Sequence, residues 1–163
     1  MRTFEDFFRV DALAFAGQGV RVTAIGRRDR LPVSLREAIE QAEAASAAGE
    51  GMHVRFAIDY SGRDAILRAA RRFQSASDGS AEDFTRLLAD AEPHSEPTPD
   101  IDLLIRTGGE QRLSNCPLWE IAYAELYFTP CLWPDFGPAD FEAAVREFGM
   151  RDRRFGRISA VAS

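Results

Sequence analysis

The sequence of 163 residues contains no lysine, and all 20 of its basic residues are arginine. The absence of lysine excludes a phosphate-binding loop built on lysine, a Schiff-base lysine and a lysine general base. A bias in genomic composition accounts for the missing lysine along most of the chain. Arginine can nevertheless bind anionic groups, because its planar guanidinium carries several N–H donors in a fixed geometry.

Histidine and cysteine are also scarce, with only two residues of each type: His53, His94, Cys116 and Cys131. Their number and spacing do not match a zinc site built from these ligands. The sequence shows neither a signal-peptide pattern nor an apolar run of about 18 residues. We therefore expect a cytoplasmic protein whose thiols are reduced and unreactive.

The balance of charge is acidic, with a formal net charge of −6 and a sequence pI of about 5.0. Proteins that bind nucleic acids usually present a basic surface, so the composition argues against nucleic acid as a partner. A chain of this length can bury one hydrophobic core, and the sequence shows no internal repeat and no long linker. It predicts a single domain over residues 1–163.

Strand patterns alternate with helical patterns along the chain. Four strands are predicted, over residues 20–25, 53–59, 101–105 and 125–128. Helical spacing begins at Phe4, and Ser34 with Glu37 has the pattern of a capping box. Further helices are predicted to begin after Ser61-Gly62-Arg63, at Ser80 and at Gly137-Pro138. The alternation predicts an α/β fold with a mainly parallel sheet flanked by helices.

Residues 101–136 give the strongest indication of a ligand site. An apolar run ends at Arg106, a turn with Gly108 and Gly109 follows, and a helix is expected at the start of the apolar stretch 118–128. A buried strand that leads through a glycine turn into a helix gathers unpaired amide N–H groups and the positive end of a helix dipole. An anionic ligand is therefore predicted here. Three side chains add further donors: Arg106, Arg112 and Ser114.

The same stretch carries a resemblance to a known family. The string RTGGEQRLSN over residues 106–115, followed by AYAELYF over 122–128 and LWPDF over 132–136, closely resembles the cis-prenyltransferases, the undecaprenyl diphosphate synthase family. The resemblance covers nearly the whole chain and extends to residues 151–156. It implies the family's α/β fold and a role in isoprenoid biosynthesis.

The resemblance also implies which residues bind substrate. In the family, the residues that match Arg106, Arg112 and Ser114 bind the diphosphate of isopentenyl diphosphate. Gly108 and Gly109 lie in the same loop, where they serve as turn residues and can also belong to the anion site. A structural alternative is that the arginines pair with neighbouring carboxylates, as surface ion pairs commonly do. No catalytic residue is identified.

Two further positions matter through the resemblance. In the family, the residue that matches Glu125 takes part in binding Mg²⁺. A structural salt bridge is an equally good hypothesis for the Glu125 carboxylate. The segment that matches Arg154 and Gly156 crosses the family's dimer to the partner's substrate, whereas a plain alternative is a solvated, basic helix end. Six aromatic residues are assigned mainly to the dimer interface: Trp119, Tyr123, Tyr127, Phe128, Trp133 and Phe136.

The implied reaction is the condensation of isopentenyl diphosphate with an allylic prenyl diphosphate in the presence of Mg²⁺. Family members carry an Asp-Gly-Asn-Gly-Arg loop that grips the allylic diphosphate, and no such string occurs in these 163 residues. In addition, Asp59 and Ser61 replace the family's Asn and Gly in the Asn-Tyr-Gly-Gly-Arg string. The carboxylate of Asp59 would repel a diphosphate at this corner unless Mg²⁺ lay between them.

Three hypotheses stay open. The first is a short enzyme in which Asp59, Arg27 or Arg28 stands in for the loop. The second is a non-catalytic or truncated family member that acts as partner subunit of a complete prenyltransferase. The third is that the sequence belongs to a longer product whose start lies upstream. The chain is expected to form a homodimer or a heterodimer with a full-length homologue, and to contact membranes only peripherally, through its product.

Overall fold

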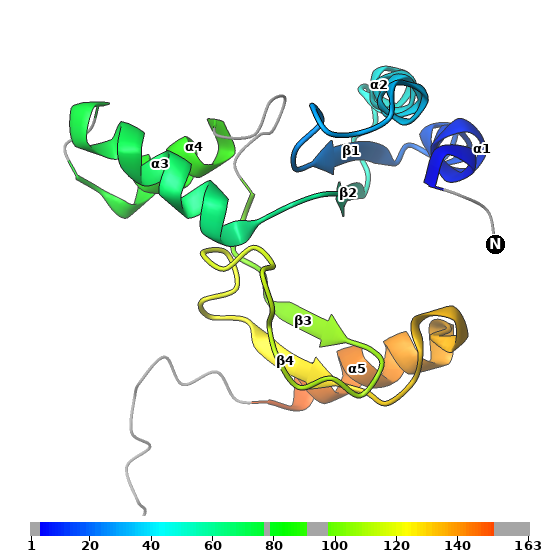
Figure 1. Ribbon diagram of the computed structural model, residues 1–163. Coiled ribbons are helices and arrows are strands. Elements are labelled where there is room, and N and C mark those ends of the chain that lie inside the picture. Colours follow the sequence, from blue (N-terminus) through cyan, green and yellow to red (C-terminus); the bar gives the residue numbers. More distant parts are fainter. Residues whose placement is uncertain (1–3, 77–78, 91–97, 152–163) are drawn as a thin grey trace, which may run out of the picture. The chain divides into compact units, whose positions relative to one another are not determined.

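The computed structural model describes residues 4–76, 79–90 and 98–151 (Figure 1). The elements are α1 (Phe4–Ala16), β1 (Arg21–Ile25), α2 (Val33–Ser46), β2 (His53–Ala57), α3 (Gly62–Ala76), α4 (Ala81–Asp90), β3 (Leu103–Arg106), β4 (Glu125–Phe128), the short 3-10 helix η1 (Trp133–Asp135) and α5 (Pro138–Met150). The predicted α/β class and the four predicted strands are confirmed.

The strands form two parallel pairs. In the first pair, β1 lies beside β2, with Arg21 opposite His53. In the second pair, β3 lies beside β4, with Leu103 opposite Glu125 and Arg106 opposite Phe128. The backbone divides accordingly into two compact units, residues 1–99 with 115–119 and residues 100–114 with 120–163. The single domain over residues 1–163 stays a prediction.

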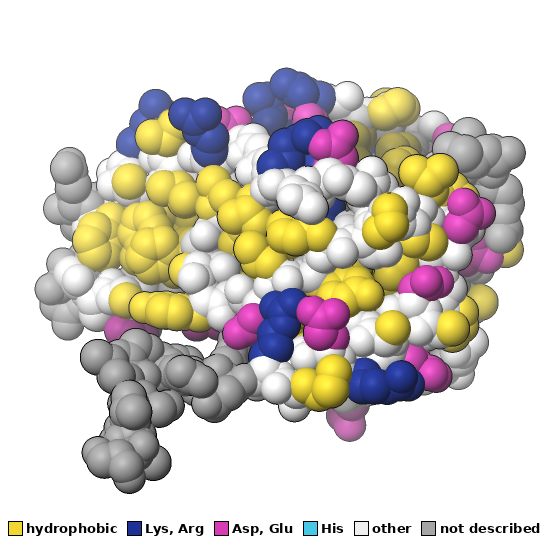
Figure 2. Space-filling view, turned by 90° about the horizontal axis from the view of Figure 1, so that it is seen from below, with side chains coloured by type: hydrophobic (Ala, Val, Ile, Leu, Met, Phe, Trp, Pro, Cys, Tyr) yellow, Lys and Arg dark blue, Asp and Glu magenta, His cyan; other side chains and the backbone are white. Residues whose placement is uncertain are grey.

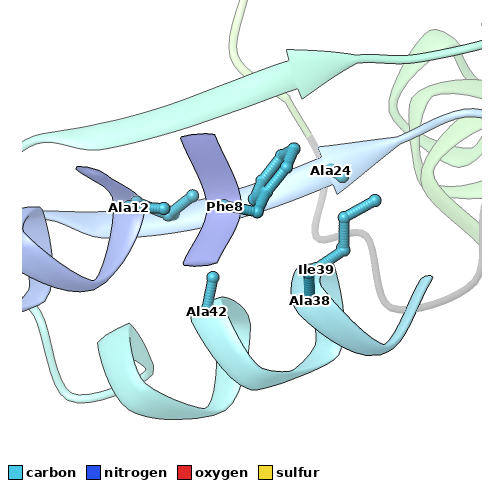
Figure 3. Close-up of a cluster of buried hydrophobic side chains, with 7 residues drawn as sticks. Phe8, Ala12, Ala24, Ala38, Ile39 and Ala42 are labelled. Atoms are coloured by element: carbon cyan, nitrogen blue, oxygen red, sulfur yellow. The ribbon is translucent and has the colours of Figure 1, made fainter. Parts of the chain in front are cut away.

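The core of the first unit lies where α1 and α2 cover β1. Phe8, Val22 and Ile39 are each fully buried, at 0% exposure. Small side chains let the two helices approach each other closely, and Figure 3 shows Ala12 and Ala42 beside Phe8 and Ile39 in this cluster. The core thus includes Phe8 of α1, whereas Phe4, where the predicted helical spacing begins, is exposed.

The predicted capping box of α2 is wrong, whereas the cap of α4 is confirmed. Helix α2 begins at Val33 after Pro32, and no side chain caps it. Ser34 therefore lies inside the first turn, and its hydroxyl donates instead to the Glu5 carboxylate of α1 at 2.8 Å. In α4, by contrast, the Ser80 hydroxyl accepts the N–H of Asp83 at 3.1 Å, as a Ser N-cap does.

The helix expected after the glycine turn is not formed. Residues 114–123 fold as turns, and no helix lies between β3 and β4. Two residues explain this difference. Ser114 has a left-handed backbone with φ of 58°, and Pro117 has no N–H and restricts the residue before it. No helix dipole therefore contributes to the candidate anion site.

In the second unit, α5 begins where the sequence predicted. Gly137 is its N-cap, and the Gly137 N–H donates to the Asp140 carboxylate at 2.9 Å. Ala144 is fully buried, whereas Phe141 and Val145 on the predicted apolar face stay 53% and 44% exposed. In the space-filling view of Figure 2, hydrophobic side chains are visible at the surface, as are arginine and acidic side chains.

The aromatic residues assigned to a dimer interface differ in their surroundings. Trp119 packs on the Phe84 ring at 4.6 Å within the first unit. Trp133, in contrast, is 75% exposed and stacks on Phe136 at 6.3 Å, and Tyr123 is 72% exposed. Trp119 thus has a partner inside the chain. The dimer itself stays a prediction.

Candidate anion-binding site after strand β3

Arg106 is the last residue of β3, and the parallel ladder holds its backbone. Its carbonyl accepts the N–H of Thr129, the first residue after β4, at 3.0 Å. Its guanidinium extends over the following loop, where Nη1 donates to the carbonyl oxygen of Arg112 and to Oγ of Ser114, the latter at 3.1 Å. The structure therefore brings the three predicted diphosphate ligands together in one loop.

Gly108 and Gly109 form the turn of this loop. Their φ angles are 85° and 75°, a left-handed conformation that glycine adopts without a steric penalty. The N–H of Gly108 donates to the Cys131 carbonyl at 2.7 Å, and the N–H of Gly109 donates to the Thr129 carbonyl at 2.9 Å. Both amides that were expected to face an anion are thus bonded to the backbone. Their part in substrate binding stays a prediction.

Ser114 ends the loop with an exposed side chain and a left-handed backbone, with φ of 58°. Such a conformation is costly for a residue other than glycine and is often found at functional sites. Its hydroxyl oxygen accepts a hydrogen bond from Arg106. The hydroxyl hydrogen therefore stays available for an acceptor such as a phosphate oxygen.

Arg112 forms an ion pair with Glu110 within the same loop. The two side chains are 62% and 48% exposed, and an ion pair with this exposure contributes little to stability. A diphosphate carries more negative charge than one carboxylate, so it can take over the guanidinium from Glu110. The arginine–carboxylate alternative and the anion-site hypothesis are thus compatible at this residue.

Glu125 lies at the other end of the same strand pair. It is the first residue of β4 and faces Leu103, whereas Arg106 lies opposite Phe128 at the far end of the ladder. The Glu125 carboxylate accepts a hydrogen bond of 2.9 Å from Arg151. Arg151 also donates to Glu147 at 2.5 Å, and its hydrogen bonds to the carboxylates of Glu147 and Glu125 raise the pKa of the Arg151 guanidinium.

These surroundings do not fit a magnesium site in a single chain. No group of three His, Cys, Asp or Glu side chains that could hold a metal occurs in the described ranges. Mg²⁺ requires several oxygen ligands in octahedral geometry, and Glu125 instead has a cation as its partner. The salt-bridge hypothesis is therefore the one that the geometry of Glu125 supports.

Arg27, Arg28 and Asp59 are the candidate substitutes for the family's Asp-Gly-Asn-Gly-Arg loop. Each of them forms an ion pair within the first unit. Arg28 donates twice to Glu43, at 2.8 and 2.6 Å, and the two side chains are only 13% and 16% exposed. Arg27 pairs with Asp29 at 2.5 Å, and Asp59 accepts from Arg30 at 2.7 Å. Arg28 is therefore a structural residue of this corner. The other two groups would have to leave their present partners to bind a ligand.

Asn115 has a role that the sequence analysis missed. Its side-chain oxygen accepts the N–H of Arg63 at 3.0 Å, and its side-chain nitrogen donates to the Ser61 hydroxyl at 2.8 Å. Its carbonyl accepts the N–H of Gly62 at 3.2 Å. Asn115 thus supplies partners for the first N–H groups of α3. The sequence contains no local signal for this pairing, because 52 residues separate Arg63 from Asn115.

The remaining predictions concern the C-terminal segment, the cysteines and membrane contact. Arg154 and Gly156 lie outside the described residues, as does His94. The two cysteines are not joined in a disulfide. Burial raises the pKa of the Cys131 thiol, and the negative charges of Asp140 and Asp135 raise it further. Among the helices described, none is both long and apolar enough to cross a membrane.

Comparison with known proteins assigns the family. A family model described as "Putative undecaprenyl diphosphate synthase" matches residues 1–156. The chain belongs to the undecaprenyl diphosphate synthase family. The resemblance seen in the loop sequence is thereby confirmed, and it holds along nearly the whole chain.

Family members from distant organisms are similar to this chain. It is 48% identical to isoprenyl transferase 1 of Bradyrhizobium diazoefficiens over 88% of its length, and 41% identical to the isoprenyl transferase of Rhodopirellula baltica over 99%. The crystal structure of lavandulyl diphosphate synthase from Lavandula x intermedia, in complex with dimethylallyl diphosphate, covers 94% of the chain with a TM-score of 0.83 and 39% identity.

The shares of those proteins that the chain covers are smaller. It spans 56% of the Bradyrhizobium protein, 68% of the Rhodopirellula protein and 68% of the lavandulyl diphosphate synthase chain. The matched proteins are prenyltransferases, so a prenyltransferase family membership is established for this chain. Its activity, substrates and partners are a matter for proposal.

Proposed function

We propose that the loop after β3 binds isopentenyl diphosphate, and that the protein takes part in the condensation of this substrate with an allylic prenyl diphosphate. The observation that supports the proposal best is the hydrogen bond of 3.1 Å from Arg106 to Ser114. It brings a cationic fork and a hydroxyl together at the exposed end of a strand, in a family of prenyltransferases.

The condensation makes clear what the loop has to do. The allylic diphosphate leaves its carbon as pyrophosphate, the double bond of isopentenyl diphosphate attacks that carbon, and the resulting cation releases a proton to give the product. Isopentenyl diphosphate keeps its own diphosphate, so that group can serve as a handle throughout. Arg106 and Arg112 would hold it by charge-assisted hydrogen bonds, and the hydroxyl of Ser114 would donate to a third oxygen. Such positioning lowers the entropic cost of bringing two substrates together.

Magnesium is implied by the family but not supported by the described side chains. Glu125 lacks companion ligands and is paired with Arg151. We therefore assign no step of the reaction to a metal held by this chain. The residues that would bind the allylic diphosphate are likewise unassigned, and Arg28 is held in a largely buried pair with Glu43.

Isothermal calorimetry with isopentenyl diphosphate tests the proposal. We expect the parent protein to bind, and Arg106→Ala to lose most of the affinity, because a hydrogen bond to a charged group contributes about 1.5–3 kcal/mol. The matched control is Arg86→Ala on α4, an exposed arginine whose partner is Asp83. Absence of heat with the parent, or equal affinity for the parent and Arg106→Ala, would refute the proposal.

A second function is a partner subunit for a complete prenyltransferase. The observation that favours it is the absence, in the described part of the chain, of a carboxylate cluster able to hold a metal. Such a subunit would form a heterodimer, whereas the enzyme would act as a homodimer, and either would meet a membrane only through its product. Co-expression with a full-length homologue tests this alternative. Failure of the two chains to copurify would exclude it.

A further inference from the structure

We propose that Thr129 is a positioning residue for the loop after β3, residues 107–114. It acts through the turn that Gly108 and Gly109 form in this loop. The inference rests on the proposed function, because it assigns Thr129 to the same site. Thr129 follows the last residue of β4, directly beyond the pair formed by Arg106 and Phe128. It belongs to none of the motif positions that the sequence indicated for substrate.

The backbone of Thr129 contacts the loop at two points. Its N–H donates to the carbonyl of Arg106 at 3.0 Å, and its carbonyl accepts the N–H of Gly109 at 2.9 Å. The first bond continues the parallel ladder beyond the end of the strands. The second bond fixes the turn. One residue thus holds both the backbone of the arginine predicted to bind substrate and the second glycine of the turn.

The hydroxyl of Thr129 adds a third contact, which affects Gly108 through Cys131. Its Oγ1 accepts the N–H of Cys131 at 3.2 Å, a local side-chain turn of the kind that Ser and Thr form. This bond orients the segment whose Cys131 carbonyl accepts the N–H of Gly108 at 2.7 Å. Because Thr is branched at Cβ, its χ1 angle is restricted and the hydroxyl is held in place.

The result is a turn whose two amides are both tied to the segment after β4. Gly108 and Gly109 have φ angles of 85° and 75°, and glycine is the residue that loses most conformational freedom when it is ordered. Without these bonds the loop would have to be ordered when the ligand binds, at a cost in affinity. Thr129 therefore contributes to affinity by organising the loop in advance, without touching the ligand.

Two substitutions separate the hydroxyl from the rest of the side chain. Thr129→Val keeps the branched shape and the backbone contacts but removes the acceptor for Cys131, whereas Thr129→Ser keeps the acceptor. The affinity for isopentenyl diphosphate is measured by calorimetry, and the hydrogen exchange of the Gly108 amide is measured by NMR without ligand. Thr85→Val on α4 is the matched control, since its hydroxyl bonds to Ala81 and Trp119.

We expect Thr129→Val to weaken binding about threefold to tenfold, the effect of one net hydrogen bond, and to accelerate exchange at Gly108. Thr129→Ser and Thr85→Val should match the parent in both measurements. The inference is overturned if Thr129→Val binds and exchanges like the parent, or if Thr129→Ser is weakened equally, since packing alone would then be responsible. Failure of the proposed function would look different, because the parent itself would show no heat.

Discussion

The guanidinium of Arg106 donates to the hydroxyl of Ser114 at 3.1 Å, across eight positions of the sequence. The carbonyl oxygen of Arg112 accepts from the same Nη1 atom. Arg106 therefore organises the inside of the loop, while the Arg112 side chain is turned toward Glu110. These bonds hold the loop together. Arg106 and Arg112 outweigh Glu110, so the net charge here is positive and can attract an anion.

Ser114→Ala should weaken the binding of isopentenyl diphosphate about threefold to tenfold, because the loop loses a donor and Arg106 loses an acceptor. Ser114→Gly removes the same hydroxyl but fits the φ of 58° better. If the hydroxyl matters, both variants bind more weakly, and Ser114→Gly should also be the more stable of the two. Calorimetry and thermal melts measure these effects. Binding by Ser114→Ala that equals that of the parent would exclude a role for the hydroxyl.

Glu125→Gln should lower the melting temperature slightly, since the carboxylate is a partner of Arg151 in a partly exposed pair. Arg151→Gln should have a similar effect, and the double variant should be no worse than the more damaging single variant. Mg²⁺ added without diphosphate should give no heat with any of these proteins. A magnesium affinity in the parent that disappears in Glu125→Gln would instead identify Glu125 as a metal ligand.

Gly62→Ala should destabilise the fold strongly. A Cβ atom at Gly62 would lie 2.0 Å from the carbonyl oxygen of Cys116, so the backbone that carries Asn115 and Cys116 would have to move. Gly149→Ala in α5 is the matched control, because nothing lies within 4 Å of its added Cβ and alanine is favoured over glycine in a helix by about 1 kcal/mol. Urea denaturation of both variants tests the contrast. A Gly62→Ala protein as stable as the parent would contradict the observed close approach.

Asp29 should make stability depend on pH in the acid range. Its hydrogen bond from Arg27 lowers the carboxyl pKa below the ordinary value of 3.8. The pair therefore stabilises the folded state at pH values above the unfolded pKa, and this contribution is lost as the pH falls through the folded pKa. Melting temperatures between about pH 5 and pH 2 should decline less steeply in Asp29→Asn than in the parent. An identical decline would show that the pair does not couple to folding.

Local patterns in the sequence were sufficient for most of the secondary structure. Periodic apolar residues identified α1 and the four strands, and a serine cap and a Gly-Pro pair identified the starts of α4 and α5. The capping box at Ser34 failed because α2 begins one residue before Ser34, after Pro32, so that Ser34 lies inside the first turn. The helix after Gly109 failed because an apolar stretch alone does not outweigh a left-handed Ser114 and Pro117.

By itself, the sequence determined the α/β class, the family and the loop that contains Arg106, Arg112 and Ser114, because periodicity and motif are local properties of the chain. Only the tertiary structure decided which donors in that loop are already used. The glycine amides are bonded to Thr129 and Cys131, and Glu125 is bonded to Arg151. These partners lie about 20 or more residues apart in sequence, and a hydrogen bond depends on distance in space, which only the folded chain defines.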